Sequence, residues 1–187
     1  MVVNIIGECD KRPVLYTCMK ILQNLGDVLL VSSSSRLMRL SDTREIGGHY
    51  QNTMIAVTAD GIDDFFEDFK YDLSDFEHVI VDNIQITEAD ITIFVEGMSI
   101  SAIEKEMLEY IDSYETIQLY KGNMLDSRTL YNLEQFESLR DMCAINQAVA
   151  EKVAKCIAKV TGKPAKNYLA MALASSTAAP KKKGLFR

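Results

Sequence analysis

The sequence has no tryptophan, three prolines, two histidines and four cysteines among its 187 residues. The cysteines do not form pairs at metal-finger spacing and two histidines add few ligands, so a structural zinc site is not expected. No segment approaches the roughly 20 apolar residues of a membrane-spanning helix, and residues 1–7 are too short and lack the basic leader of a signal peptide. We therefore expect a cytoplasmic protein whose thiols, Cys9, Cys18, Cys143 and Cys156, stay reduced.

The composition is that of one globular domain. Hydrophobic residues make up 48% of the chain and charged residues 25%, which suffices for one substantial core but not for two ordinary domains. We predict a single domain over residues 1–173 and a flexible basic tail over residues 174–187. The formal net charge of −7 disfavours broad binding to nucleic acid, because an acidic body repels phosphate backbones.

Short apolar runs alternate with amphipathic segments along the chain. Strands are predicted at residues 2–7, 28–31, 53–59, 79–81, 91–95 and 117–120. Helices are predicted from residue 13 to about 25, and at 36–40, 62–69, 101–112, 130–136 and 139–160. Ser101 and Glu104 have the spacing of a capping box, Gly162 and Pro164 end the last helix, and Gly47 and Gly48 mark a turn. This alternation predicts an α/β fold, a three-layer α/β/α sandwich around a mostly parallel, doubly wound sheet.

Ligands of a doubly wound sheet bind beyond the carboxyl ends of the strands, so the loop after the first strand is the first candidate site. The loop begins at Gly7 and precedes a helix, which is the placement of a phosphate-binding loop of the form G-x-x-x-x-G-K-[ST]. Arg12, Pro13 and Val14 stand where that motif has its second glycine, its lysine and its hydroxyl. The loop thus lacks the lysine and the magnesium-binding hydroxyl.

Two later segments, taken together with this loop, resemble segments of a known protein family. Residues 75–82 (DFEHVIVD) form an apolar strand ending in an aspartate, and residues 89–95 (ADITIFV) open a further strand with Ala-Asp. In this order over residues 1–161, the chain resembles the MinD/ParA group of nucleotide-dependent positioning ATPases, including its divergent TadZ-like members. The resemblance implies a fold like that of the P-loop NTPases.

The resemblance also indicates which residues would contact a nucleotide if binding were retained: Gly7, Asp10, Lys11 and Asp82. The second lysine of the family's phosphate loop would fall at Glu8 and is therefore missing. We expect no catalytic residue, no metal and no cofactor, with ATP and magnesium disfavoured. Asp82 is then expected to cap the turn that follows its strand.

The connection after Asp82 is short for the predicted topology. Residues 83–89 alone separate this strand from the next, whereas a parallel crossover usually needs about a dozen residues. Either the connection is unusually tight or the two strands are not both parallel.

A response-regulator receiver is the competing interpretation. Glu8, Asp10, Asp82 and Lys121 resemble the receiver's magnesium-binding acids, phosphorylated aspartate and lysine. The stretch after Asp82 leaves no room for the helix that a receiver has there, so this hypothesis ranks second.

Three other features have a functional and a structural interpretation. The serines at 32–35 suit either an anion site or ordinary caps, and caps are favoured. Cys9 lies beside Glu8 and Asp10, which would raise the pKa of its thiol and keep it inert. Small residues on the last long helix allow either core packing, which is favoured, or close approach of a partner helix: Ala144, Ala148, Ala150, Ala154 and Ala158.

The end of the chain combines basic and bulky apolar residues, namely Lys181, Lys182, Lys183, Leu185 and Phe186. MinD itself ends in an amphipathic membrane-targeting segment, but this tail is far shorter. Each cation near anionic lipid contributes about 1 kcal/mol, so weak peripheral membrane contact at the inner face of the membrane is one alternative. The others are a solubilising disordered end and a short peptide that docks on a protein partner.

These observations favour a catalytically impaired MinD/ParA-like protein, not an enzyme. It would act through protein–protein contacts, with a homodimer among the options, as a scaffold or positioning component of a bacterial secretion, conjugation, pilus or partition apparatus. The alternatives are a divergent nucleotide-binding switch and an atypical receiver.

Overall fold

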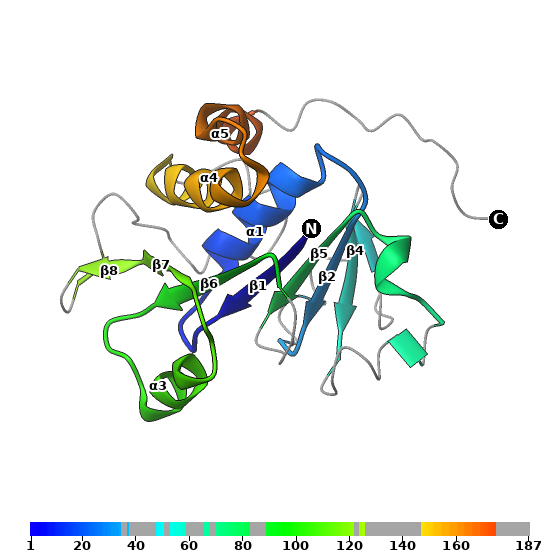
Figure 1. The fold of residues 1–187 in the computed structure, drawn as a ribbon. Helices are drawn as coiled ribbons and strands as arrows, with labels where there is room; N and C mark the ends of the chain where they lie inside the picture. Colours follow the sequence, from blue (N-terminus) through cyan, green and yellow to red (C-terminus); the bar gives the residue numbers. More distant parts are fainter. Residues whose placement is uncertain are drawn as a thin grey trace.

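The computed structural model describes residues 1–34, 37, 48–50, 53–58, 66–67, 70–82, 89–121, 124–125 and 147–174. A seven-stranded sheet forms the middle of the molecule, with helices on either side (Figure 1). The fold is therefore the predicted three-layer α/β/α sandwich around a mostly parallel sheet.

The strand order is β3-β4-β2-β5-β1-β6-β7. All neighbouring strands pair in parallel except β3, which runs antiparallel to β4 at one edge. The strands are β1 (Val2–Ile6), β2 (Val28–Ser32), β3 (Gly48–Tyr50), β4 (Thr53–Val57), β5 (His78–Asp82), β6 (Ile91–Glu96) and β7 (Glu115–Gln118). A separate antiparallel pair, β8 (Tyr120–Lys121) and β9 (Met124–Leu125), follows β7.

The helices divide between the two faces of the sheet. Helix α1 (Arg12–Leu22) leads from β1 to β2, and α3 (Ala102–Glu109) leads from β6 to β7 in the other direction along the sheet. The two helices lie on opposite sides of the sheet (Figure 1), as the rule of right-handed crossovers predicts for opposite directions. Two further helices, α4 (Gln147–Thr161) and α5 (Ala165–Leu173), pack on each other and on α1. A 3₁₀ turn, η2 (Leu73–Asp75), precedes β5.

Alternate residues of the strands build two cores. Val3, Ile5, Leu30 and Ile93 belong to the larger core, which α1, α4 and α5 cover. The opposite face presents a smaller cluster of strand residues, packed against Phe66, Tyr71 and Phe76: Leu29, Val31, Met54, Ala56, Val79 and Val81. Burial on both faces explains why the strands read as continuous apolar runs.

Of the two alternatives for the short connection after Asp82, the structure has the one in which both strands are parallel. β5 and β6 both pair in parallel with β1, one on each side of it. The connection of residues 83–90 therefore joins two parallel strands that lie on opposite sides of β1.

Elements that were not predicted include β3 and α5. Gly48 was assigned to a turn, yet it begins β3, and residues 165–173 were assigned no element, yet they form α5. The end of α4 was predicted correctly: Gly162 takes a left-handed conformation with φ of 68°, and its amide bonds the Ala158 carbonyl.

The alanines of α4 favour the core interpretation. Ala150 and Ala154 are buried in the larger core, and Ala148 and Ala158 are half-buried. Several predictions lie outside the described residues: the helix at 130–136, most of the helices at 36–40 and 62–69, and residues 139–146 with Cys143 and Ala144. The same holds for Lys181, Lys182, Lys183, Leu185 and Phe186. Within the described part of the chain, no helix is long and apolar enough to cross a membrane.

Candidate functional site

A cleft of about 290 Å³ opens at the carboxyl ends of β1, β2 and β5. Strand β1 continues into the loop that starts α1, β2 ends in serines, and β5 ends in Asp82. The cleft is lined by Glu8, Cys9, Asp10, Lys11, Arg12, Leu15, Ser33, Ser34, Leu37 and Asp82. Its position is where doubly wound sheets bind their ligands.

The backbone geometry of the loop after β1 requires a glycine at position 7. Its φ is +133°, a conformation that side chains rarely adopt, and an added Cβ would lie 2.4 Å from the Val95 carbonyl oxygen. The glycine thus allows the loop after β1 to pass close to the backbone of β6.

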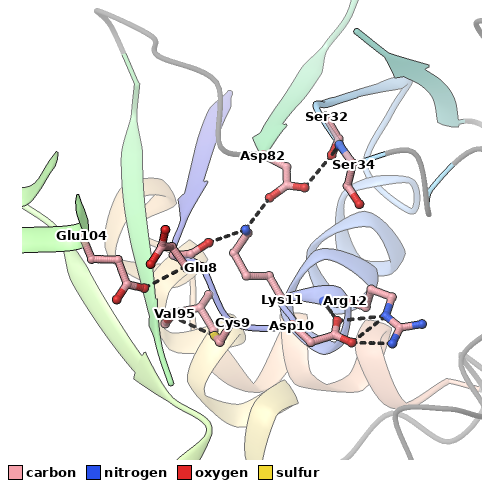
Figure 2. Close-up of polar contacts among 11 residues, drawn as sticks. Glu8, Cys9, Asp10, Lys11, Arg12, Ser32, Ser34, Asp82, Val95 and Glu104 are labelled. Atoms are coloured by element: carbon pink, nitrogen blue, oxygen red, sulfur yellow. Dashed lines mark hydrogen bonds and ion pairs between the residues drawn. The ribbon is translucent and has the colours of Figure 1, made fainter. Parts of the chain in front are cut away.

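Lys11 supplies the charge at the centre of the site (Figure 2). It occupies the position before the first residue of α1, and its side chain turns back beneath the loop. Nζ donates to the Gly7 carbonyl oxygen at 2.5 Å and lies 3.1 Å from Oδ1 of Asp82. Both side chains are almost fully buried, with 7% and 4% exposed. This pair holds the first and fifth strands of the chain together at their carboxyl ends.

Asp82 is also bound from its other side. Oδ2 accepts the Ser32 hydroxyl at 2.5 Å, and the Ser32 Oγ in turn accepts the backbone N–H of Ser34 at 3.0 Å. Lysine, aspartate and serine thus form one buried chain of polar contacts that links the start of α1, β5 and β2 (Figure 2). The caps predicted for Asp82 and the serines depend on residues after Asp82 and Ser34 that lie outside the described part of the chain.

Polar groups at the start of α1 form hydrogen bonds with adjacent residues of the same segment. The Asp10 carboxylate accepts the Arg12 backbone N–H at 3.1 Å and pairs with the Arg12 guanidinium. Pro13 has no N–H, and the Val14 N–H donates to the Lys11 carbonyl. The amides of Arg12 and Val14 are therefore engaged within the protein, and Pro13 has none to offer a ligand.

A fourth connection comes from α3. Glu104 is buried, and its Oε1 accepts the Glu8 N–H at 2.8 Å while its Oε2 accepts the Ser101 N–H at 2.8 Å. The Ser101 hydroxyl accepts the Glu104 N–H, so the predicted capping box is confirmed. One carboxylate thus caps α3 and fastens the loop after β1 to that helix.

Cys9 lies in the same loop, with its Sγ 3.2 Å from the Val95 carbonyl oxygen, to which it donates. Burial raises the pKa of its thiol to about 11, Lys11 opposes this rise, and Glu104 and Asp10 add to it. The predicted direction is confirmed, but burial is the main cause and Glu104 takes the place assigned to Glu8. A thiol with this pKa is mostly protonated and poorly nucleophilic at neutral pH.

Three of the four residues proposed to contact a nucleotide, Asp10, Lys11 and Asp82, line the cleft, and Gly7 lies beside it. Of the receiver set, Lys121 lies in the β8–β9 pair beyond the edge strand β7, and β1 and β6 separate β7 from Asp82. The lysine that contacts Asp82 is Lys11. Among the described residues, no group of three or more histidine, cysteine, aspartate or glutamate side chains is arranged to hold a metal ion.

Two site residues were not predicted in their roles. Ser32 was considered only within a serine run, and Glu104 only as a helix cap. A polar residue ending an apolar strand was the available signal for Ser32, whereas the Glu104 contact joins residues 96 positions apart and leaves no local pattern.

No protein-family model matches this sequence, and comparison with curated proteins finds no significant match.

Proposed function

We propose that this protein is a non-hydrolysing relative of the MinD/ParA-like ATPases that acts as a scaffold or positioning component through protein–protein contacts. The family is inferred from the order of segments described above, and the assembly it would serve is a bacterial secretion, conjugation, pilus or partition apparatus. It would act in the cytoplasm, with recruitment to the inner face of the membrane as one option.

This proposal rests on one observation: at the phosphate-loop position, carboxylates of the protein itself accept the backbone amides that would otherwise bind phosphate. Glu104 accepts the Glu8 amide, Asp10 accepts the Arg12 amide, and Pro13 offers none. A phosphate loop works because its amides point at the ligand unpaired, so a nucleotide would have to displace two side-chain carboxylates here.

Charge in the cleft supports the same conclusion. The lining side chains include three carboxylates, from Glu8, Asp10 and Asp82, against the two cations Lys11 and Arg12. Each cation is already paired with a carboxylate, so the cleft offers a triphosphate an excess of negative charge. The volume also lies at the lower limit of ordinary ligand pockets.

Magnesium would have little to hold it. In the phosphate-loop enzymes a hydroxyl at the start of the helix and an aspartate on a neighbouring strand share the ion. Val14 stands in the hydroxyl's place, and the carboxylate of Asp82 is bound by Lys11 and Ser32.

Calorimetric titration of the full-length chain with ATP and ADP, each with magnesium, tests the proposal. We expect no binding heat and the same light-scattering mass with and without nucleotide. Micromolar binding that changes the mass would overturn the proposal and support a nucleotide-dependent switch. Phosphorylation of Asp82 by a small phosphodonor would instead support the receiver hypothesis.

A further inference from the structure

Helix α3 and its flanks expose large apolar side chains. In the described part of the molecule, the most exposed large hydrophobic residue is Tyr110, at 80%, followed by Met98 at 60% and Ile103 at 59%. Ile100 and Tyr114 are 37% and 42% exposed. These five residues define what we name the α3 face, and such a concentration on one short unit marks an interaction surface.

The helix presents this face because of its periodicity. Ile103 in the first turn of α3 and Tyr110 at its C-cap are seven residues apart, about two helical turns, so they lie on one side, with the half-buried Met107 between them. The side turned toward the protein carries Glu104. The helix is thus held to the body through a buried carboxylate, while an apolar stripe remains outside.

The border of the α3 face is acidic. Glu106, Glu109 and Asp112 are exposed beside the stripe, with Lys105 as the basic residue of the helix. A partner that covers the apolar side chains and complements this charge must carry bulky apolar residues next to several cations.

This chain contains such a segment at its own end. Residues 181–187 read KKKGLFR, with four cations and the bulky residues Leu185 and Phe186. The described chain ends at residue 174 after α5, which packs with α1 and α4 on the other face of the sheet from α3 (Figure 1). The described end of the chain thus lies across the sheet from the α3 face of the same molecule, so we assign the binding segment to a second copy.

We propose that the α3 face binds the Lys181–Arg187 segment of a second copy of this protein. This inference rests on the proposed scaffold function and deepens it by naming a contact surface and its occupant. The contact joins unlike surfaces, so it can link copies in chains or close a reciprocal dimer. Because the interface is small and edged by charges, association is expected to be weak and to weaken further at high salt.

The test measures light-scattering mass over a wide concentration range for the full-length chain and three double variants. Ile103→Ser/Tyr110→Ser removes the apolar stripe, Leu185→Ser/Phe186→Ser removes the apolar part of the tail, and Val160→Ser/Leu173→Ser is the control. The control positions are exposed apolar residues of α4 and α5, at 38% and 43%. Circular dichroism and thermal unfolding confirm that each variant is folded.

We expect the mass of the wild type and the control to rise with concentration, and each of the other two variants to stay monomeric. A mixture of the stripe variant and the tail variant retains one intact stripe and one intact tail, so it should form a one-to-one dimer. A wild type that stays monomeric, a tail variant that associates as the wild type does, or a mixture that does not pair would overturn the inference. Nucleotide binding, measured separately, would overturn the scaffold function without altering these masses.

Discussion

Lys11 and Asp82 neutralise each other at the carboxyl edge of the sheet, almost out of contact with solvent. Removing one member of a buried ion pair leaves the other charge without a partner, which costs about 3–5 kcal/mol. We expect Lys11→Met to lower the free energy of unfolding by roughly this amount. Urea unfolding followed by circular dichroism measures it.

The double variant Lys11→Met/Asp82→Asn provides the control. Both charges are absent from it, and the asparagine can still bond Ser32, so the loss should be clearly smaller than that of Lys11→Met alone. A loss equal to the sum of the two single variants would mean that the pair is not coupled as described.

His78 predicts a loss of stability on the acid side. Burial lowers its pKa below 6.5, the positive amino terminus lowers it further, and Glu77 acts in the opposite direction. A group with a depressed folded pKa stabilises the fold above its unfolded pKa, and this contribution is lost as the pH falls through the folded pKa. Wild-type protein should therefore lose more stability than His78→Gln between about pH 7.5 and about pH 5.

The other histidine, His49, is present in both proteins and its effect cancels. Urea unfolding at the two pH values gives the comparison. Equal losses in wild type and variant would show that His78 does not titrate as its burial requires.

The residues of the site could be predicted in part. The order of strands indicated that the loop after β1 and the end of β5 would meet, which placed Asp10, Lys11 and Asp82 together. The sequence did not indicate that Lys11 would turn back onto Asp82, because this depends on the conformation of a loop in which Gly7 has a positive φ. The comparison with the phosphate-loop motif placed Pro13 at the position of the motif's lysine. The lysine that contacts Asp82 lies two residues earlier, at Lys11.

At the scale of the element, the Glu104 carboxylate fastens α3 to the loop after β1. Replacing Glu104 by alanine removes the acceptors of two half-buried amides, those of Glu8 and Ser101. We expect Glu104→Ala to cost about 2 kcal/mol or more, because hydrogen bonds to charged groups contribute about 1.5–3 kcal/mol each. Urea unfolding of the variant gives the value.

Ser101→Ala and Glu104→Gln separate the two roles of Glu104. Ser101→Ala affects the cap alone and should cost about 1 kcal/mol. Glu104→Gln keeps one acceptor oxygen, so its loss should fall between the other two. If Glu104→Ala costs no more than Ser101→Ala, the bond to the loop after β1 contributes nothing to stability.

Local signals explain which elements could be predicted. The spacing of Ser101 and Glu104 and the position of Gly162 predicted where α3 begins and α4 ends. In contrast, β3 is a three-residue edge strand, and its pairing with β4 depends on a neighbour already in place. Helix α5 packs through Tyr168 and Ala172 onto the larger core, a tertiary contact that its short alanine-rich sequence does not reveal.

At the scale of the whole molecule, the sheet brings the carboxyl ends of β1, β2 and β5 to one edge, where polar groups from these segments contact one another. Lys11 and Ser32 contact Asp82, Asp10 contacts Arg12, and Glu104 contacts Glu8, so these polar groups are engaged within the protein. The parallel order could be predicted because buried strands alternate with helices. The contacts between these polar groups could not be predicted, because they depend on side chains that come from four separate elements.

Hydrogen exchange of the backbone amides at Glu8 and Arg12, with and without ATP and magnesium, tests this account most directly. Amides held by carboxylates exchange slowly, so both should be protected in the free protein and unchanged when nucleotide is added. Amides that exchange freely and become protected only with ATP and magnesium would contradict the account, because the loop would then be open to phosphate.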